Sequence, residues 1–234
     1  MFFLPPPTFK TLKALVISYL YASTLLLTVE IIQRTFKISI HITRKVIHVL
    51  SGLFMFFLLY LFEQWEYVVF LTGSFVIINY IFLRMRMVRS MDPLNGATLG
   101  TVYFAFSCAF LFGWFNKDWE RGFPRGREYL AIAGIMAMTF GDASASIIGR
   151  KYGTHRVMGR KTIEGSLANF VVTMVAVPFF WYILSPPTLA TRDYFTGALI
   201  SASVSTCLEA ISPMGSDNLT VPLGVAFTLS RLGY

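Results

Sequence analysis

The chain has 234 residues, of which 55% are hydrophobic and only 14% are charged, and its mean hydropathy is +0.62. Soluble globular domains carry about 25% charged residues, so this composition excludes that class and indicates a polytopic membrane protein. A formal net charge of +8 would suit nucleic acid, but the sequence leaves no soluble domain to hold a basic groove. We therefore expect anionic lipids and phosphorylated small molecules as partners, and no nucleic acid.

Seven apolar runs approach the roughly 20 residues that a helix needs to cross a bilayer. They cover residues 12–32, 46–62, 67–83, 98–115, 129–148, 167–184 and 194–211. A shorter run at 219–232 predicts a last span across a thinned bilayer or a re-entrant helix. Because neither a convincing repeat nor a long linker divides the chain, the sequence predicts an all-α fold. We expect one helical membrane domain over 1–234, with seven to eight transmembrane helices.

Lysine and arginine are unevenly shared between the two sets of alternating loops. Twelve of the 20 basic residues fall in one set, which contains the segments 34–48, 84–89 and 150–161. Positively charged loops favour the cytoplasmic side of a membrane. The bias predicts that the regions around 34–48, 141–166 and 212–222 lie together on the cytoplasmic face.

The segment 141–166 combines acids, cations and glycines between two apolar runs, and we expect it to form a catalytic loop. Asp142 ends an apolar run, where a charge is costly unless it is paired or faces a polar cavity. Phosphoryl transfer needs carboxylates that hold Mg²⁺ and cations that neutralise phosphate oxygens. Asp142 and Glu164 are the candidate metal ligands. The candidate phosphate-binding residues are Arg150, Lys151, Arg160, Lys161, Gly149 and Gly165. The G-x-x-x-x-G-K-[ST] spacing of a P-loop is absent, and a basic loop with ordinary turn glycines remains the alternative.

A second polar group begins the second apolar run. Arg44 and His48 are four residues apart, so they share one face of a helix, with Lys45 beside Arg44. These side chains could bind phosphate or position a lipid headgroup. The alternative is that the two cations are interfacial anchors and His48 is merely hydrogen-bonded.

A third polar group surrounds a break after the seventh run. Glu209 lies near the end of that run, Pro213 and Gly215 interrupt the helix, and Asp217 and Asn218 open the next segment. Two acids and an amide at such a break could complete a metal shell. A helix end followed by an N-cap would explain Asp217 or Asn218, but not Glu209.

In this order the three groups resemble the CTP-dependent lipid-alcohol kinases of membranes: the dolichol and polyprenol kinases, the phytol kinases and the CTP-dependent diacylglycerol kinases. The resemblance covers roughly residues 44–222 and rests on Arg-Lys-x-x-His at 44–48, Gly-Asp at 141–142, Lys-Thr-Ile-Glu-Gly-Ser at 161–166 and Asp-Asn-Leu-Thr-Val-Pro at 217–222. It implies CTP as donor, Mg²⁺ as cofactor and a membrane alcohol as acceptor, with the dolichol type favoured. The catalytic residues that it implies are Asp142, Lys161, Glu164, Asp217 and His48, with Glu209 as a further metal ligand. The implied location is the endoplasmic reticulum in a eukaryote or the cell membrane in a prokaryote.

Two alternatives stay open at this point. The phosphatidate cytidylyltransferases have a similar Gly-Asp helix and Lys-Thr-x-Glu-Gly segment, but they transfer CMP instead of phosphate. The tail Ser-Asp-Asn-Leu-Thr-Val-Pro at 216–222 departs from their closing Gly-Asp helix, which favours the kinase. A small transporter would also keep acids in its helices, but it would distribute them along a midplane pathway.

Overall fold

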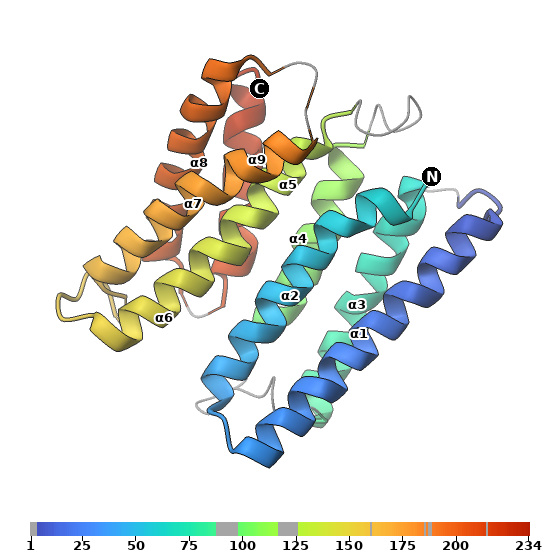
Figure 1. The fold of residues 1–234 in the computed structure, drawn as a ribbon, viewed down its shortest axis with the longest axis horizontal. Coiled ribbons are helices and arrows are strands. Elements are labelled where there is room, and N and C mark those ends of the chain that lie inside the picture. Colours follow the sequence, from blue (N-terminus) through green and yellow to red (C-terminus); the bar gives the residue numbers. More distant parts are fainter. Residues whose placement is uncertain are drawn as a thin grey trace.

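The computed structural model describes residues 4–87, 98–116, 126–159, 161–184, 186, 189–213 and 215–234. Within these residues every regular element is a helix, apart from one isolated bridge between Arg156 and Thr162. The helices, shown in Figure 1, are α1 (Phe9–Phe36), α2 (Ile40–Leu61), α3 (Trp65–Met85), α4 (Gly100–Trp114), α5 (Glu128–Met136), η3 (Ala137–Asp142), α6 (Ala143–Tyr152), α7 (Ile163–Leu184), α8 (Thr191–Ile211) and α9 (Asp217–Arg231).

Six spans among the described residues are long and apolar enough to cross a membrane. They are Phe9–Phe36, Ile40–Leu61, Trp65–Met85, Glu128–Tyr152, Ile163–Leu184 and Arg192–Ile211, and α4 is a shorter apolar helix. The prediction of an all-helical polytopic membrane protein is confirmed. The last helix, α9, begins at Asp217 and has 15 residues, so it is shorter than these six spans.

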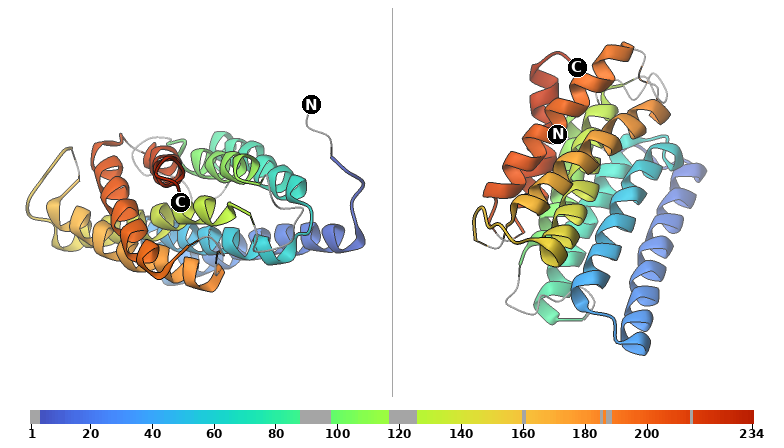
Figure 2. Two further views of the ribbon diagram at one scale, coloured as in Figure 1. Left: turned by 90° about the horizontal axis from the view of Figure 1, so that it is seen from above. Right: turned by 60° about the vertical axis from the view of Figure 1, so that its left-hand side comes forward.

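The polar segments lie at helix ends on one side of the bundle. Figure 1 shows the α1/α2 turn and the α6/α7 connection at the same end of the molecule, while both chain termini lie toward the other end. Seen from above in Figure 2, α3 and α4 form a second layer over α1 and α2. Segments that are more than 100 residues apart in sequence therefore meet at one end of the bundle.

The span Glu128–Tyr152 is the centre of the bundle. In its most apolar window 72% of the residues are buried, against 11% to 44% in the other five spans. All nine residues of α5 are buried, and several of them are alanine or glycine, which lets neighbouring helices approach closely. The span is not a regular α-helix, because η3 is a turn of π-helix that ends at Asp142. Such turns are rare, and they occur frequently at functional sites.

The segment 141–166 is more helical than the sequence predicted. Residues 143–152 form α6, and α7 already begins at Ile163, so only the residues between them form a connection. The alanines of α6 are strong helix formers, which explains why the helix continues past Asp142. The connection folds back on itself: Val157 N–H donates to the Lys161 carbonyl at 2.9 Å, and Ile163 N–H to the His155 carbonyl at 2.8 Å.

Helix α9 crosses the central span at Gly134. A Cβ at this position would overlap the carbonyl oxygen of Pro222, so the two backbones are in direct contact. A residue larger than glycine would force α5 and α9 apart. This contact helps to fix where α9 begins, and with it the position of Asp217.

We expect Gly134→Ala to lower thermal stability, because overpacking of this kind costs about 1–3 kcal/mol. The matched control is Gly73→Ala in α3, where no atom outside the adjoining helix backbone lies within 4 Å of an added Cβ. Alanine in an open helical position should instead stabilise slightly. The measurement is the unfolding temperature of both variants in detergent. Equal unfolding temperatures would show that the α5–α9 contact is not as close as described.

Candidate active site

Three buried carboxylates from separate helices form the core of the site. Asp142 ends η3, Glu209 lies in the last turn of α8, and Asp217 is the first residue of α9. One ligand oxygen from each lies within 4.8 Å of the others, and the three residues are only 6%, 3% and 7% exposed. Buried carboxylates at this separation repel one another unless cations neutralise them. We call this group the acid cluster.

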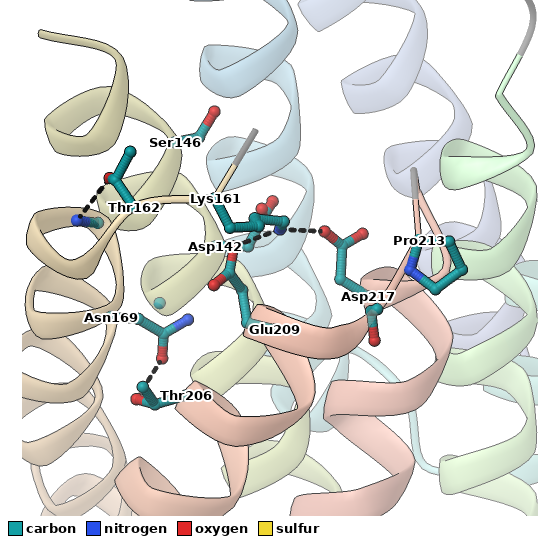
Figure 3. A network of polar contacts seen from close by, with 12 residues as sticks. Asp142, Ser146, Lys161, Thr162, Asn169, Thr206, Glu209, Pro213 and Asp217 are labelled. Atoms are coloured by element: carbon teal, nitrogen blue, oxygen red, sulfur yellow. Dashed lines mark hydrogen bonds and ion pairs between the residues drawn. The ribbon is translucent and has the colours of Figure 1, made fainter. Parts of the chain in front are cut away.

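Two lysines supply positive charge to the acid cluster. Lys45 Nζ lies 2.6 Å from Asp142 Oδ2. Lys161 Nζ forms ion pairs with Glu209 and with Asp217, the latter at 3.2 Å, and Figure 3 shows the acids gathered around it. Burial lowers the pKa of Lys161, but the carboxylates of Asp217 and Glu209 outweigh this effect and raise the pKa above its ordinary value. Lys161 therefore stays an ammonium ion within the cluster.

His48 borders the acid cluster on the α2 side. Its Nε2 atom lies 3.6 Å from Asp142 Oδ2 and 3.5 Å from the Met138 carbonyl oxygen in η3. Its ring packs edge-on against Phe104 of α4, with 5.5 Å between ring centroids. Two turns earlier on α2, His41 Nε2 lies 2.9 Å from Ser146 Oγ on α6. The polar face of α2 is thus in contact with both η3 and α6.

A cavity of about 540 Å³ opens over these groups. This volume lies within the range of roughly 300–1,000 Å³ that is typical of small-molecule sites. Eleven of the residues singled out in the sequence line it: Arg44, Lys45, His48, Asp142, Gly149, Arg150, Lys161, Gly165, Glu209, Asp217 and Asn218. The three polar groups of the sequence therefore meet in one cavity.

Three of the candidate residues are not among the described residues that line the cavity. Arg160 lies outside the described residues. Lys151 is exposed on α6, with its Nζ 4.9 Å from the centroid of the Tyr152 ring. Glu164, one of the four expected metal ligands, contacts the α6/α7 connection, whereas the other three form the acid cluster.

Glu164 has clear partners in the α6/α7 connection. Its Oε1 accepts a hydrogen bond from Thr154 Oγ1 at 2.7 Å and lies 2.7 Å from His155 Nδ1, and the His155 N–H is 3.3 Å away. The reason is positional: Glu164 sits in the first turn of α7, directly after the folded-back connection. These contacts tie the first turn of α7 to the connection that precedes it.

The glycines of this region pack two helices together. A Cβ at Gly165 would lie 2.8 Å from the Ala145 carbonyl oxygen, and one at Gly149 would lie 2.9 Å from Thr162 Oγ1. These glycines therefore let α6 and α7 approach closely, at positions that also line the cavity. Thr162, which the sequence analysis did not select, fills the space between these glycines.

His41 is a further cavity residue that the sequence analysis did not select. It is the second residue of α2, and His41, Lys45 and His48 follow at intervals of four and three. These intervals put the three side chains on one helical face. This periodicity in the sequence could have identified His41 as a candidate site residue.

The fold and the cavity define a polytopic helical membrane protein with a buried acid–lysine site suited to a divalent cation and nucleotide phosphates. The model of the Cytidylyltransferase family matches residues 7–216, so the chain belongs to this family. A phytol kinase of Synechocystis sp. is 32% identical over 215 residues, covering 88% of this chain and 85% of that protein.

Two further relatives have different acceptors in their names. CTP-dependent diacylglycerol kinase 1 of Saccharomyces cerevisiae is 24% identical over 216 residues, covering 78% of this chain and 70% of its own length. Dolichol kinase EVAN of Arabidopsis thaliana is 34% identical over 104 residues, which cover 42% of this chain and 17% of that protein. No solved structure matches the chain. The expected relationship to the CTP-dependent lipid kinases is confirmed, and the chain is an enzyme of this group.

Lys161→Met should lower the unfolding temperature in the absence of divalent cations, because it leaves Glu209 and Asp217 without their shared ammonium group. An unpaired buried charged group costs at least about 1–3 kcal/mol. Millimolar Mg²⁺ should recover part of the loss. The control is Lys151→Met on the exposed side of α6, which should change little. If both variants unfold at the wild-type temperature, the ion pairs of Lys161 contribute nothing to stability.

Proposed function

We propose that the enzyme transfers the γ-phosphate of CTP to the hydroxyl group of an isoprenoid alcohol dissolved in the membrane, of the dolichol, polyprenol or phytol kind. The observation that carries the proposal is the convergence of three buried carboxylates and two lysines on one cavity. The names of the phytol and dolichol kinases support the acceptor class. Diacylglycerol is the second candidate acceptor, because a diacylglycerol kinase matches most of the chain.

The acid cluster fits Mg²⁺ as the metal cofactor. Its donors are all carboxylate oxygens, which are the ligands that hard divalent cations prefer, and they come from three helices that a shared ion would hold together. Asp142, Glu209 and Asp217 would hold the ion. When bound, Mg²⁺ would neutralise the negative charge that develops on the transferred phosphate.

The cations of the cavity are arranged to bind the triphosphate. Lys45 and Lys161 already contact the acid cluster, so each can reach a phosphate oxygen that binds there. Arg44 and Arg150 line the same cavity and supply two guanidinium groups for the remaining phosphates. In the transfer, the alcohol oxygen attacks the γ-phosphorus, the bond from that phosphorus to the β–γ bridging oxygen breaks, and CDP leaves.

His48 and Asp142 are the side chains that would handle the acceptor hydroxyl. His48 lies between the acid cluster and the aromatic wall at Phe104, so we assign it to orient the hydroxyl group. Asp142 lies beside His48 through its Oδ2 atom, at 3.6 Å from His48 Nε2. Asp142 or Asp217 would accept the hydroxyl proton, through a carboxylate oxygen that does not hold the ion. Glu164 would act as a positioning residue, which clamps the connection that carries Lys161.

We further propose that the cavity faces the cytoplasm, where CTP is made. The segments with the greater share of basic residues support this orientation. In a eukaryote the membrane would be the endoplasmic reticulum, and in a prokaryote the cell membrane.

Purified enzyme in mixed micelles should transfer label from γ-labelled CTP to a polyprenol in the presence of Mg²⁺. Asp142→Asn should reduce this transfer at least about 10³-fold, equivalent to about 4 kcal/mol of transition-state stabilisation, while the protein remains folded. The control is Glu63→Gln, which removes an exposed acid that pairs with Lys10 away from the site. Near-normal transfer by Asp142→Asn would refute its assigned role.

The same assay separates the alternative reactions. Pyrophosphate release from CTP with phosphatidate present, without any labelled alcohol product, would identify a cytidylyltransferase. The absence of both products under conditions where the protein is folded would contradict the proposed chemistry.

Glu164→Gln tests whether this acid binds the metal or positions the connection. A positioning role predicts a higher KM for CTP with an unchanged Mg²⁺ concentration for half-maximal rate. Glu209→Gln should instead raise the Mg²⁺ requirement, because it removes a carboxylate of the acid cluster. If Glu164→Gln raises the Mg²⁺ requirement as much as Glu209→Gln does, Glu164 is a metal ligand and not a positioning residue.

A further inference from the structure

The cavity does not end at the acid cluster. Beyond His48 it continues between the layer of α1 and α2 and the layer of α3 and α4, which Figure 2 shows one above the other. This part is lined largely by apolar side chains from all four helices: Leu25, Leu26, Phe54, Met55, Phe75 and Phe104. We call it the apolar end of the cavity.

Three polar side chains in the wall of the apolar end donate hydrogen bonds to backbone carbonyl groups. The Thr72 hydroxyl donates to the Val68 carbonyl of its own helix at 2.7 Å. The Asn79 side-chain amide donates to the Thr101 carbonyl on α4 at 3.1 Å. The Tyr21 hydroxyl donates to the Leu50 carbonyl at 3.0 Å. These donors are already satisfied, so the wall favours an apolar occupant.

One wall of the apolar end is held in place by stacked rings. Tyr21 of α1 stacks on Phe54 of α2, with 4.1 Å between centroids and 10° between planes. On the opposite side, Phe104 packs against the ring of His48 and forms the boundary between the apolar end and the acid cluster. A molecule that lies along the cavity would therefore place an apolar chain against Phe104 and its polar head beside His48 and Asp142.

We propose that the apolar end holds the hydrocarbon chain of the acceptor alcohol next to its hydroxyl group, and that it is shaped for one chain rather than two. This inference rests on the proposed function. We assign the hydrocarbon chain to the apolar end because the apolar end and the acid cluster are parts of a single cavity. The whole cavity measures about 540 Å³, and its charged end must also take phosphate groups. The volume that remains favours the first part of one isoprenoid chain over the paired chains of diacylglycerol.

Filling the apolar end provides the first test. Leu25→Trp narrows the cavity from the α1 side, and it should raise the KM for a prenyl alcohol at least about tenfold while the KM for CTP stays unchanged. The matched control is Leu27→Trp, the same substitution two residues away on the 63% exposed outer face of α1. Equal kinetics in the two variants, with phosphate transfer intact, would overturn the proposed chain site.

The second test does not depend on transfer. A single-chain prenyl alcohol with a photoreactive diazirine on its chain should label Leu25, Phe104 or their neighbours in the cavity wall, with the site assigned residue by residue, and excess unlabelled alcohol should suppress the labelling. Labelling without any phosphate transfer would support the chain site while contradicting the proposed function. Labelling confined to outward-facing residues such as Leu27 would refute the chain site.

The one-chain assignment is tested by competition between acceptors. With a prenyl alcohol and diacylglycerol at equal concentrations in the same micelles, the prenyl alcohol should take most of the label. Phosphorylation of diacylglycerol at an equal or greater rate would overturn the one-chain assignment.

Discussion

The structure depends on the neutralisation of three carboxylates that the fold removes from water. Asp142, Glu209 and Asp217 come from different helices and would repel one another without counter-charge. Lys45 and Lys161 provide it, and each is drawn from a different part of the chain. The carboxylates and lysines that neutralise one another come from α2, the central span, the α6/α7 connection and the α8/α9 break, so these elements must lie together. The helix contacts around the site then serve to hold charged groups at fixed separations.

Close helix contacts provide that control of position. Gly134 lets α9 touch the central span, which fixes the start of α9 and thus Asp217. Gly149 and Gly165 let α6 and α7 meet, and the connection between these helices delivers Lys161. Glu164 holds the same connection through Thr154 and His155. Small residues and one peripheral acid therefore determine the geometry of groups that they do not touch.

Much of this arrangement could be predicted from the sequence, because apolar run length and the cost of buried acids are local signals. The runs identified the membrane helices, and Asp142, Glu209 and His48 stood out as polar residues in apolar segments. The π-helical turn could not be predicted, since it arises from how the central span packs. The direction of Glu164 depends on the folded-back connection, and the pairing of Lys45 with Asp142 joins residues that are 97 apart. The apolar end was missed because its residues look like ordinary lipid-facing side chains until four helices surround them.

The lysines of the acid cluster have a thermodynamic consequence. An ammonium group that neutralises a carboxylate is not free to serve a phosphate, so each lysine has two competing kinds of partner. A divalent cation on the carboxylates would release Lys45 and Lys161 toward the nucleotide, and a nucleotide that binds the lysines would leave the carboxylates ready for the cation. If the proposed metal site is occupied, metal and nucleotide would increase each other's affinity by the same factor, as reciprocity between linked sites requires. The ion pairs of the acid cluster would then be a source of cooperativity between the two ligands.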